Sequence, residues 1–379
     1  MNEITISKMG TISLLMIASL TIMVGTVVAP GLLSISKELG VENYATWLIT
    51  IPALGVVIFS LFLVKIVKKL GYYNALKMGL IAYGFFGISG MFLEGIFPVF
   101  LDRFLLGGAT GIVLVSVNGL ITHFYHGQQR VKIMALQVIS VESGGVLILG
   151  ISGILAVISW EYPFYIYMFA WLFFIMLCLF IPNPNISLEA NSEENTVEIK
   201  SSIKSILSMV LFSMFLFFTV IIILPIYLLD FGFTEDQIGY LLAFISAMAI
   251  VAAGTTPILS KKLQKRTILT IAFMAYTIGH LILFSFTGTF SFILSSFFFG
   301  IGFGLTMPTL NHIVIEKSIP INLTKNLALF TMMIFLGQFL ASFSTFLPVN
   351  ISFIFLLATF LSLFLVFCLQ ILKFGKGAL

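Results

Sequence analysis

Long apolar runs separated by short polar stretches follow one another from residue 11 to near the end of the chain. A helix needs about 20 apolar residues to cross a bilayer, whereas membrane strands are about half as long and alternate apolar with polar residues. The runs are long and lack this alternation, so the pattern predicts an all-α membrane protein. Its twelve predicted transmembrane helices cover residues 11–34, 45–67, 75–93, 97–121, 133–158, 162–181, 205–229, 237–260, 268–286, 290–315, 325–347 and 350–372.

One long polar segment interrupts this pattern in the middle of the chain. Residues 183–204, NPNISLEANSEENTVEIKSSIK, are acidic and poor in aromatic side chains, which is typical of a linker without a packed core. We therefore expect an N-terminal six-helix bundle over residues 1–182, a cytoplasmic linker over 183–204, and a C-terminal six-helix bundle over 205–379.

The charges of the short loops predict which way the helices cross the membrane. Lysine and arginine mark the cytoplasmic side, and they gather in every second loop and in the C-terminal tail: Lys65, Lys68, Lys69, Lys77, Arg130, Lys132, Lys261, Lys262, Lys265, Arg266, Lys317, Lys325, Lys373 and Lys376. The other loops carry acids, with Lys37 as the exception: Glu38, Glu42, Glu94, Glu161, Asp230, Glu235 and Asp236. Both termini are therefore expected in the cytoplasm, with the protein in the cell membrane.

Composition supports an integral membrane protein, because 60% of the residues are hydrophobic and only 9% are charged. A soluble domain carries about 25% charged residues. The net charge of +4 follows from the loops and does not indicate a nucleic-acid partner. Cys178 and Cys368 lie in apolar runs, so we expect no disulfide. With no ATP-binding loop in the sequence, we expect no cofactor or metal, and a monomer in the lipid bilayer.

The second half of the chain repeats features of the first half at an offset of 193 residues. The matches include two lysine pairs and two asparagines, which apolar chains do not share as readily as Leu, Ile or Gly. The paired positions are Lys68-Lys69-Leu70 with Lys261-Lys262-Leu263, Ala82-Tyr83 with Ala275-Tyr276, and Phe104, Gly107, Gly111 and Asn118 with Phe297, Gly300, Gly304 and Asn311. Parallel six-helix repeats build one large class of transporters, with substrate bound between the halves.

Several motifs resemble those of the major facilitator superfamily, and within it the twelve-helix drug:proton antiporters. The motifs are VVAPGLLSISKELG at 27–40, DRFLLGGATG at 102–111, the glycines of the fifth span with SWEYPFYIY at 159–167, and FGIGFGLTMP at 299–308. The resemblance covers essentially the whole chain. It implies alternating access and a role in gating or close packing for Lys69, Gly71, Gly107, Gly111, Gly144, Gly145, Gly150 and Gly153.

The chain departs from the family pattern at two places. The family loop between spans 2 and 3 has the form G-x-x-x-D-R-x-G-R-R, and here its aspartate position holds Lys68, while Tyr72 and Tyr73 replace the basic pair. The proline of the fifth-span motif is also missing, because Ile151 follows Gly150. The resemblance therefore implies the fold more firmly than it implies antiport.

Glu142 is the one acid predicted deep in a membrane span. It lies nine residues after residue 133, which is roughly 13 Å into the membrane at 1.5 Å per residue. Desolvation favours the protonated form of a carboxylate, as a proton-driven transporter without ATP requires. The alternatives are a carboxylate that contacts the substrate and a neutral one that only bonds neighbouring helices.

Arg103 lies about two turns from the outer end of the fourth predicted span. The family resemblance implies that this arginine acts in the central cavity, in proton coupling or in substrate binding. The alternative is a side chain that extends to the outer interface. We expect Asp102 to point elsewhere, because adjacent helical residues do not face each other.

Three further polar residues are candidates for the substrate cavity: Gln338, Asn118 and Asn311. The two asparagines are repeat partners, and we expect them to form interhelical hydrogen bonds. His280 and His312 fit a structural role better than a proton relay. A set of aromatic residues belongs either to a cavity or to interfaces and helix contacts: Trp47, Tyr83, Trp171, Tyr227, Tyr240 and Tyr276.

These features leave three functions to consider. The first is a proton-coupled exporter of small amphipathic molecules. The second is an exporter or importer of one metabolite, such as a metallophore, sugar or nucleoside. The third is an intramembrane enzyme or an assembly subunit. The sequence contains no paired catalytic carboxylates, no metal-ligand spacing and no serine-type motif that would support it. We therefore expect a transporter of small molecules and protons rather than an enzyme.

Overall fold

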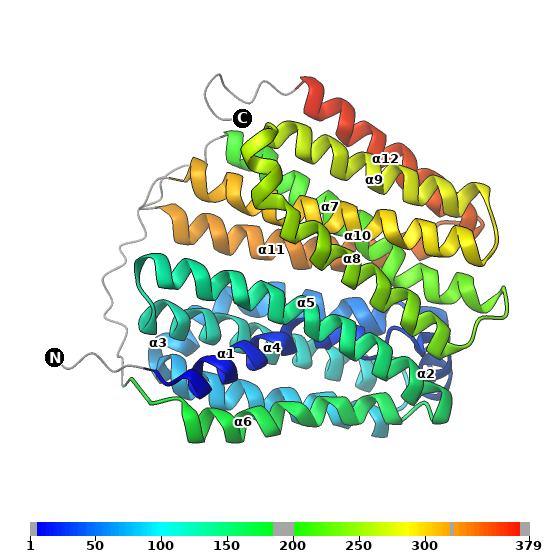
Figure 1. The fold of residues 1–379 in the computed structure, drawn as a ribbon. Helices are drawn as coiled ribbons and strands as arrows, with labels where there is room; N and C mark the ends of the chain where they lie inside the picture. The colour runs from blue at the N-terminus through cyan, green and yellow to red at the C-terminus, as the bar shows by residue number, and fades with distance from the viewer. Residues whose placement is uncertain (1–5, 185–200, 319–321, 372–379) are drawn as a thin grey trace. The chain divides into compact units, whose positions relative to one another are not determined.

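The computed structural model describes residues 6–184, 201–318 and 322–371, and these residues fold into helices with no strand among them (Figure 1). Their contacts divide the chain into two compact units. The first unit comprises residues 1–194 together with 234–239, and the second comprises 195–233 and 240–379. Most of the predicted linker, residues 185–200, lies outside the described residues.

In the first unit, α1 packs against α4, α5 and α6, and α3 packs along α4. Its α-helices are α1 (Lys8–Thr26), α2 (Leu32–Glu38), α3 (Trp47–Ser89), α4 (Ile96–Phe124), α5 (Gly127–Ile158) and α6 (Phe169–Phe180). Three short 3₁₀ turns, Glu42–Tyr44, Gly90–Phe92 and Tyr162–Met168, connect them.

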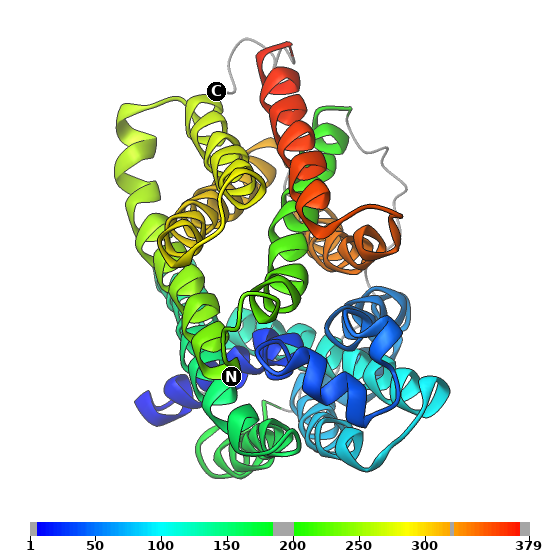
Figure 2. The same cartoon turned by 90° about the vertical axis from the view of Figure 1, so that its right-hand side faces the viewer.

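In the second unit, α7 packs against α10 and α11, and α9 packs against α10 and α12 (Figure 2). Its α-helices are α7 (Ser201–Leu229), α8 (Glu235–Lys262), α9 (Lys265–Ser285), α10 (Thr289–Lys317), α11 (Leu323–Ala341) and α12 (Ile351–Ile371), with a 3₁₀ turn at Ser342–Phe346.

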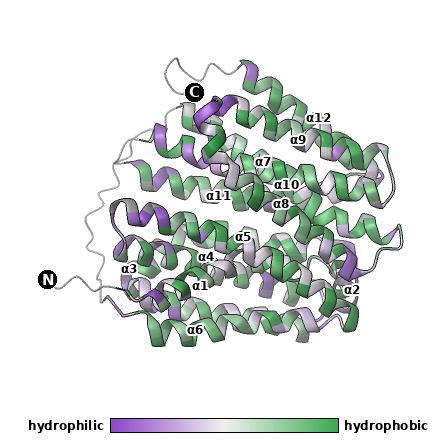
Figure 3. Ribbon diagram, viewed as in Figure 1, coloured by the Kyte–Doolittle hydropathy of each residue, from purple (hydrophilic) through white to green (hydrophobic). Residues whose placement is uncertain are grey.

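Eleven helices of the described residues are long and apolar enough to cross a membrane. The apolar segment Trp47–Ser60, within the second predicted span, is shorter. Hydrophobic residues run along the helices, while hydrophilic residues gather near their ends (Figure 3). This distribution is the one that a bilayer requires, because lipid tails cannot hydrogen-bond to polar side chains.

Two predicted spans differ from the structure in their local geometry. The first predicted span, 11–34, is broken, because α1 ends at Thr26 and α2 begins only at Leu32. Pro30 lies in the intervening turn, where its missing N–H and its restriction of the preceding residue disfavour a continuous helix. Predicted spans 2 and 3 form one stretch, α3, which is interrupted only at Gly71 with φ 74° and ψ 159°. Only glycine adopts these angles readily.

Glycines bring helices close together at matching places in the two units. A Cβ atom on Gly107 would collide with the Pro52 carbonyl oxygen, and one on Gly300 would collide with the Ile245 carbonyl oxygen. Gly304 similarly packs against the backbone of α8. The numbers of both partners differ by 193 between the two units, the offset that relates the sequence matches.

Candidate functional site

A buried ion pair occupies the interior of the first unit. The Arg103 guanidinium donates from Nε and Nη2 to Asp102 Oδ2, at 3.0 and 2.7 Å. Asp102 Oδ1 accepts a hydrogen bond from Ser89 Oγ at 2.6 Å. The Arg103 and Asp102 side chains are 1% and 6% exposed, so the pair is shielded from both water and lipid.

This arrangement corrects one expectation and argues against one alternative. Asp102 does not point away from Arg103, because the long arginine side chain folds back to reach the carboxylate of its neighbour. Arg103 also does not extend to the outer interface, since it is almost completely buried. Adjacent side chains leave a helix in different directions, which keeps short side chains apart but does not prevent a long, flexible arginine from folding back.

Backbone and aromatic groups complete the surroundings of Arg103. Its Nη2 donates to the carbonyl oxygens of Phe86 and Gly87 at 2.7 and 3.2 Å, and its Nη1 donates to Tyr167 Oη at 3.4 Å. The guanidinium carbon lies 5.5 Å from the ring centroids of Phe164 and of Tyr167, which is cation–π geometry. The guanidinium therefore joins α3, α4 and the Tyr162–Met168 turn.

Two tyrosines extend this network to α1. Tyr167 Oη donates to the Val24 carbonyl at 3.0 Å, and Tyr83 Oη donates to the Leu20 carbonyl at 2.7 Å. Tyr167 and Ser89 are not among the site residues predicted from the sequence. Tyr167 stands in the motif SWEYPFYIY, but nothing in that motif indicates a partner 64 residues away.

Glu142 lies on α5 and is partly exposed. Within the described part of the chain, its carboxylate makes no hydrogen bond and no ion pair, so it is not a partner of Arg103. Ser140 Oγ donates to the Leu15 carbonyl, and Gly144 packs against Ser19, which places both residues on the side of α5 that contacts α1. Two residues correspond to about 200° around a helix, so Glu142 faces away from α1.

The predicted packing glycines of α5 have different surroundings. Gly145 packs against Ile22 of α1, and Gly153 packs against the backbone of Glu235 and Gly239, in the first turns of α8 that group with the first unit. Gly150 has open space around it, so close packing does not require a glycine there.

The other predicted polar residues lie apart from one another. Asn118 on α4 accepts a hydrogen bond from Gln137 Nε2 on α5 at 2.8 Å, which confirms an interhelical hydrogen bond and adds Gln137 to the polar groups of this unit. Asn311 on α10 and Gln338 on α11 are partly exposed and make no hydrogen bond with a described residue. The interhelical bond predicted for Asn311 is therefore absent from the described residues.

The two histidines predicted to be structural, His280 and His312, have contrasting environments. His280 is fully buried, and its ring centroid lies 4.8 Å from the ring centroid of Phe299 and 6.1 Å from that of Phe355. His312 is exposed, and its Nδ1 lies 3.9 Å from Glu316 Oε2. Among the described residues, no cluster of three or more His, Cys, Asp or Glu side chains could hold a metal ion.

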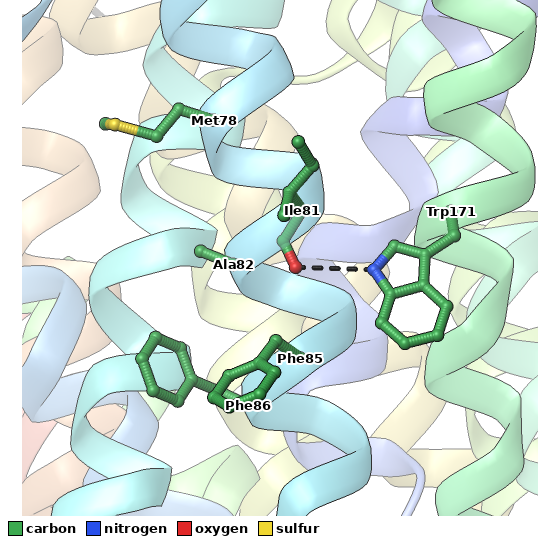
Figure 4. A pocket seen from close by; sticks show the side chains of 6 residues that line it. All are labelled: Met78, Ile81, Ala82, Phe85, Phe86 and Trp171. Carbon is green, nitrogen blue, oxygen red and sulfur yellow. Dashed lines mark hydrogen bonds between the residues drawn. The ribbon is translucent and has the colours of Figure 1, made fainter.

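The predicted aromatic candidates divide between buried and exposed positions. Tyr83 and Tyr276 are completely buried and bonded to other helices, so they do not line an open cavity. Trp171 instead lines an apolar groove of about 600 Å³ on the first unit (Figure 4). Its indole N–H donates to the Ile81 carbonyl at 3.3 Å, so it is not free to bond a substrate. The groove is lined by Met78, Ile81, Ala82, Phe85, Phe86 and Trp171.

Comparisons with known proteins agree with this architecture. A family model described as Major Facilitator Superfamily matches residues 14–342. A solved structure described as a D-xylose-proton symporter is similar with a TM-score of 0.79 at 16% identity, covering 96% of this chain and 98% of that one.

Two other solved structures are similar over nearly their whole length. The inward-open xylose transporter XylE from E. coli has a TM-score of 0.78 at 14% identity, with 97% of both chains covered. A variant of the nucleoside transporter NupG has a TM-score of 0.74 at 14% identity, with 95% of this chain and 99% of that one covered. At these identities the likeness is one of fold. No curated protein matches the chain.

Proposed function

The chain belongs to the major facilitator superfamily of multi-pass membrane transporters, and from this premise we propose that it is a proton-coupled exporter of small amphipathic molecules. It works by alternating access between two six-helix repeats of twelve spans in all, in the plasma membrane, with both termini in the cytoplasm. The paired glycine contacts at an offset of 193 residues support the repeat, and the lysine-rich loops support the orientation.

The unpaired carboxylate of Glu142 carries the proposal. An ionised side chain near the centre of a membrane helix costs about 2.5–3.5 kcal/mol on insertion scales, and binding a proton removes that charge. Because Glu142 is partly exposed and bonds to no described residue, it is free to exchange a proton or to contact a substrate. These are the properties of a group that couples substrate movement to a proton gradient.

We assign Arg103 a positioning role in this mechanism. Its charge is already balanced by Asp102, and its donors are engaged by four oxygen atoms on Asp102, Phe86, Gly87 and Tyr167. An anionic substrate that drew Arg103 away from Asp102 would leave the carboxylate buried without its partner, at a cost of about 3–5 kcal/mol. Arg103 is therefore a poor ligand for such a substrate. It instead holds α3, α4 and the Tyr162–Met168 turn of the first unit together.

The second candidate function is transport of one specific metabolite. It is favoured by the fact that solved structures of similar fold are described as transporters of xylose, nucleosides or peptides. Lys68 and Ile151 also depart from the antiporter motifs. An efflux assay over a chemically diverse panel separates the two, because a multidrug exporter expels several unrelated compounds and a metabolite transporter moves one class.

The variant Glu142→Gln tests the proposed coupling. Glutamine keeps the shape of the side chain but cannot release a proton, so a proton gradient should no longer drive substrate uphill in proteoliposomes. Downhill exchange should survive. The matched control is Glu38→Gln, the same chemical change at an exposed position in α2, which should transport as the parent protein does.

Proton release on substrate binding to the purified protein provides a second readout. The parent protein should release protons and Glu142→Gln should not. If Glu142→Gln still concentrates substrate and still releases protons, Glu142 is not the coupling group. If the variant loses only the binding of cationic substrates, Glu142 is a substrate contact instead.

A further inference from the structure

Four cationic residues lie within six positions where α8 ends and α9 begins. Lys261 and Lys262 are the last residues of α8, and Lys265 and Arg266 are the first residues of α9. We call these four residues the α8–α9 basic patch. Both helices are long and apolar enough to cross a membrane, so the patch lies where such helices leave the apolar core of the bilayer.

The patch has more positive charge than its own contacts balance. Lys265 forms an ion pair with Glu316 at the end of α10. Arg266 Nη2 donates to Gln370 Oε1 at 2.9 Å and to the Gln370 carbonyl, both neutral acceptors. The buried Nε of Arg266 has no hydrogen-bond partner among the described residues. Lys261 and Lys262 are exposed and pair with no described residue.

The equivalent loop of the first unit supplies an internal comparison. At the 193-residue offset, Lys68 and Lys69 match Lys261 and Lys262, but Tyr72 and Tyr73 stand where the second unit has Lys265 and Arg266. The Tyr72 ring packs against Gly119 of α4, where a Cβ atom would collide with it. At this position the first unit therefore joins α3 to α4 through an aromatic contact, where the second unit joins α9 to α10 through the Lys265–Glu316 ion pair, and it lacks the second pair of cations.

We propose that the α8–α9 basic patch binds the headgroup of an anionic phospholipid. A cluster of lysine and arginine directly beside membrane helices attracts the negative lipids of the cytoplasmic leaflet, at about 1 kcal/mol per charge. Lys261 and Lys262 offer mobile ammonium groups to the phosphate oxygens, and the first turn of α9 adds backbone N–H groups that no side chain caps. The apolar surfaces of the adjoining helices would then lie beside the acyl chains.

The test measures lipid binding to the purified full-length protein in a neutral detergent. Phosphatidylglycerol and phosphatidylcholine with identical acyl chains are titrated and bound copies are counted by native mass spectrometry. We expect one tightly bound molecule of phosphatidylglycerol per protein, which phosphatidylcholine does not displace. Removing both exposed lysines, Lys261→Gln with Lys262→Gln, should weaken it roughly thirtyfold, because one charge is worth about a factor of five.

The matched control is the double variant Lys68→Gln with Lys69→Gln, which removes two lysines at the equivalent positions of the first unit. Phosphatidylglycerol binding should change less than about twofold there. Thermal unfolding in lipid-free detergent checks that each variant folds.

Three results would overturn the proposal. Equal binding of the two lipids would show that no headgroup is recognised. An equal loss in both double variants would show that general positive charge, rather than this patch, attracts the lipid. Displacement of phosphatidylglycerol by millimolar inorganic phosphate would identify a free-anion site. The proposal does not depend on the proposed transport function, because its readout is lipid binding.

Discussion

The buried Asp102–Arg103 pair should be a principal determinant of the stability of the first unit. Asp102→Ala leaves the guanidinium with carbonyl and hydroxyl acceptors but no counter-charge, in a position where only 1% of the arginine is exposed. Breaking such a pair from one side costs about 3–5 kcal/mol. For a bundle of this size, that cost lowers the unfolding temperature by on the order of 10 °C.

The assay is thermal unfolding in detergent, followed by size-exclusion chromatography after heating. Ser89→Ala is the graded control, because it removes one hydrogen bond to Asp102 Oδ1 and leaves the ion pair intact. A hydrogen bond to a charged group is worth about 1.5–3 kcal/mol, so Ser89→Ala should cost less than Asp102→Ala. Raising the salt concentration should not change the difference, since buried pairs are weakly screened.

A double-mutant cycle provides the decisive comparison. Asp102→Asn and Arg103→Met should each destabilise the protein, while the double variant should recover part of the loss, because no unpaired charge then remains in the bundle. If the two single effects simply add, the two side chains do not interact as the structure indicates. If neither substitution lowers the unfolding temperature, the positioning role assigned to Arg103 is wrong.

Two further predictions concern the backbone and the topology. Gly71→Ala should lower the free energy of unfolding by about 1–3 kcal/mol, because φ 74° and ψ 159° are strained for any residue with a side chain. Gly150→Ala lies in helical backbone with open space around it, so it should be neutral or stabilising. Thermal unfolding of both variants measures the difference, and equal effects would contradict the prediction. In a background without the native cysteines, a cysteine at Glu161 or Glu235 should react with an impermeant thiol reagent outside intact cells and one at Glu193 should not, and the reverse pattern would place the termini outside.

The sequence was sufficient for the fold because a bilayer imposes simple rules on it. Apolar runs of sufficient length must form helices, since lipid cannot satisfy a bare backbone. Helix positions and the superfamily followed from run length and motifs, and the family model agrees. The helix ends differ from those predicted: the first predicted span is broken near Pro30, and predicted spans 2 and 3 form one stretch that is interrupted at Gly71.

Which polar groups meet was decided only by the tertiary structure. Arg103 and Glu142 looked like comparable cavity candidates in the sequence, because both are charges inside apolar runs. In the structure, Arg103 is enclosed by Asp102 and Tyr167, while Glu142 has no partner among the described residues. The length of an apolar run is read from the consecutive residues of one segment. A hydrogen bond between helices depends on how distant helices rotate and pack, and hydrophobicity does not encode that packing.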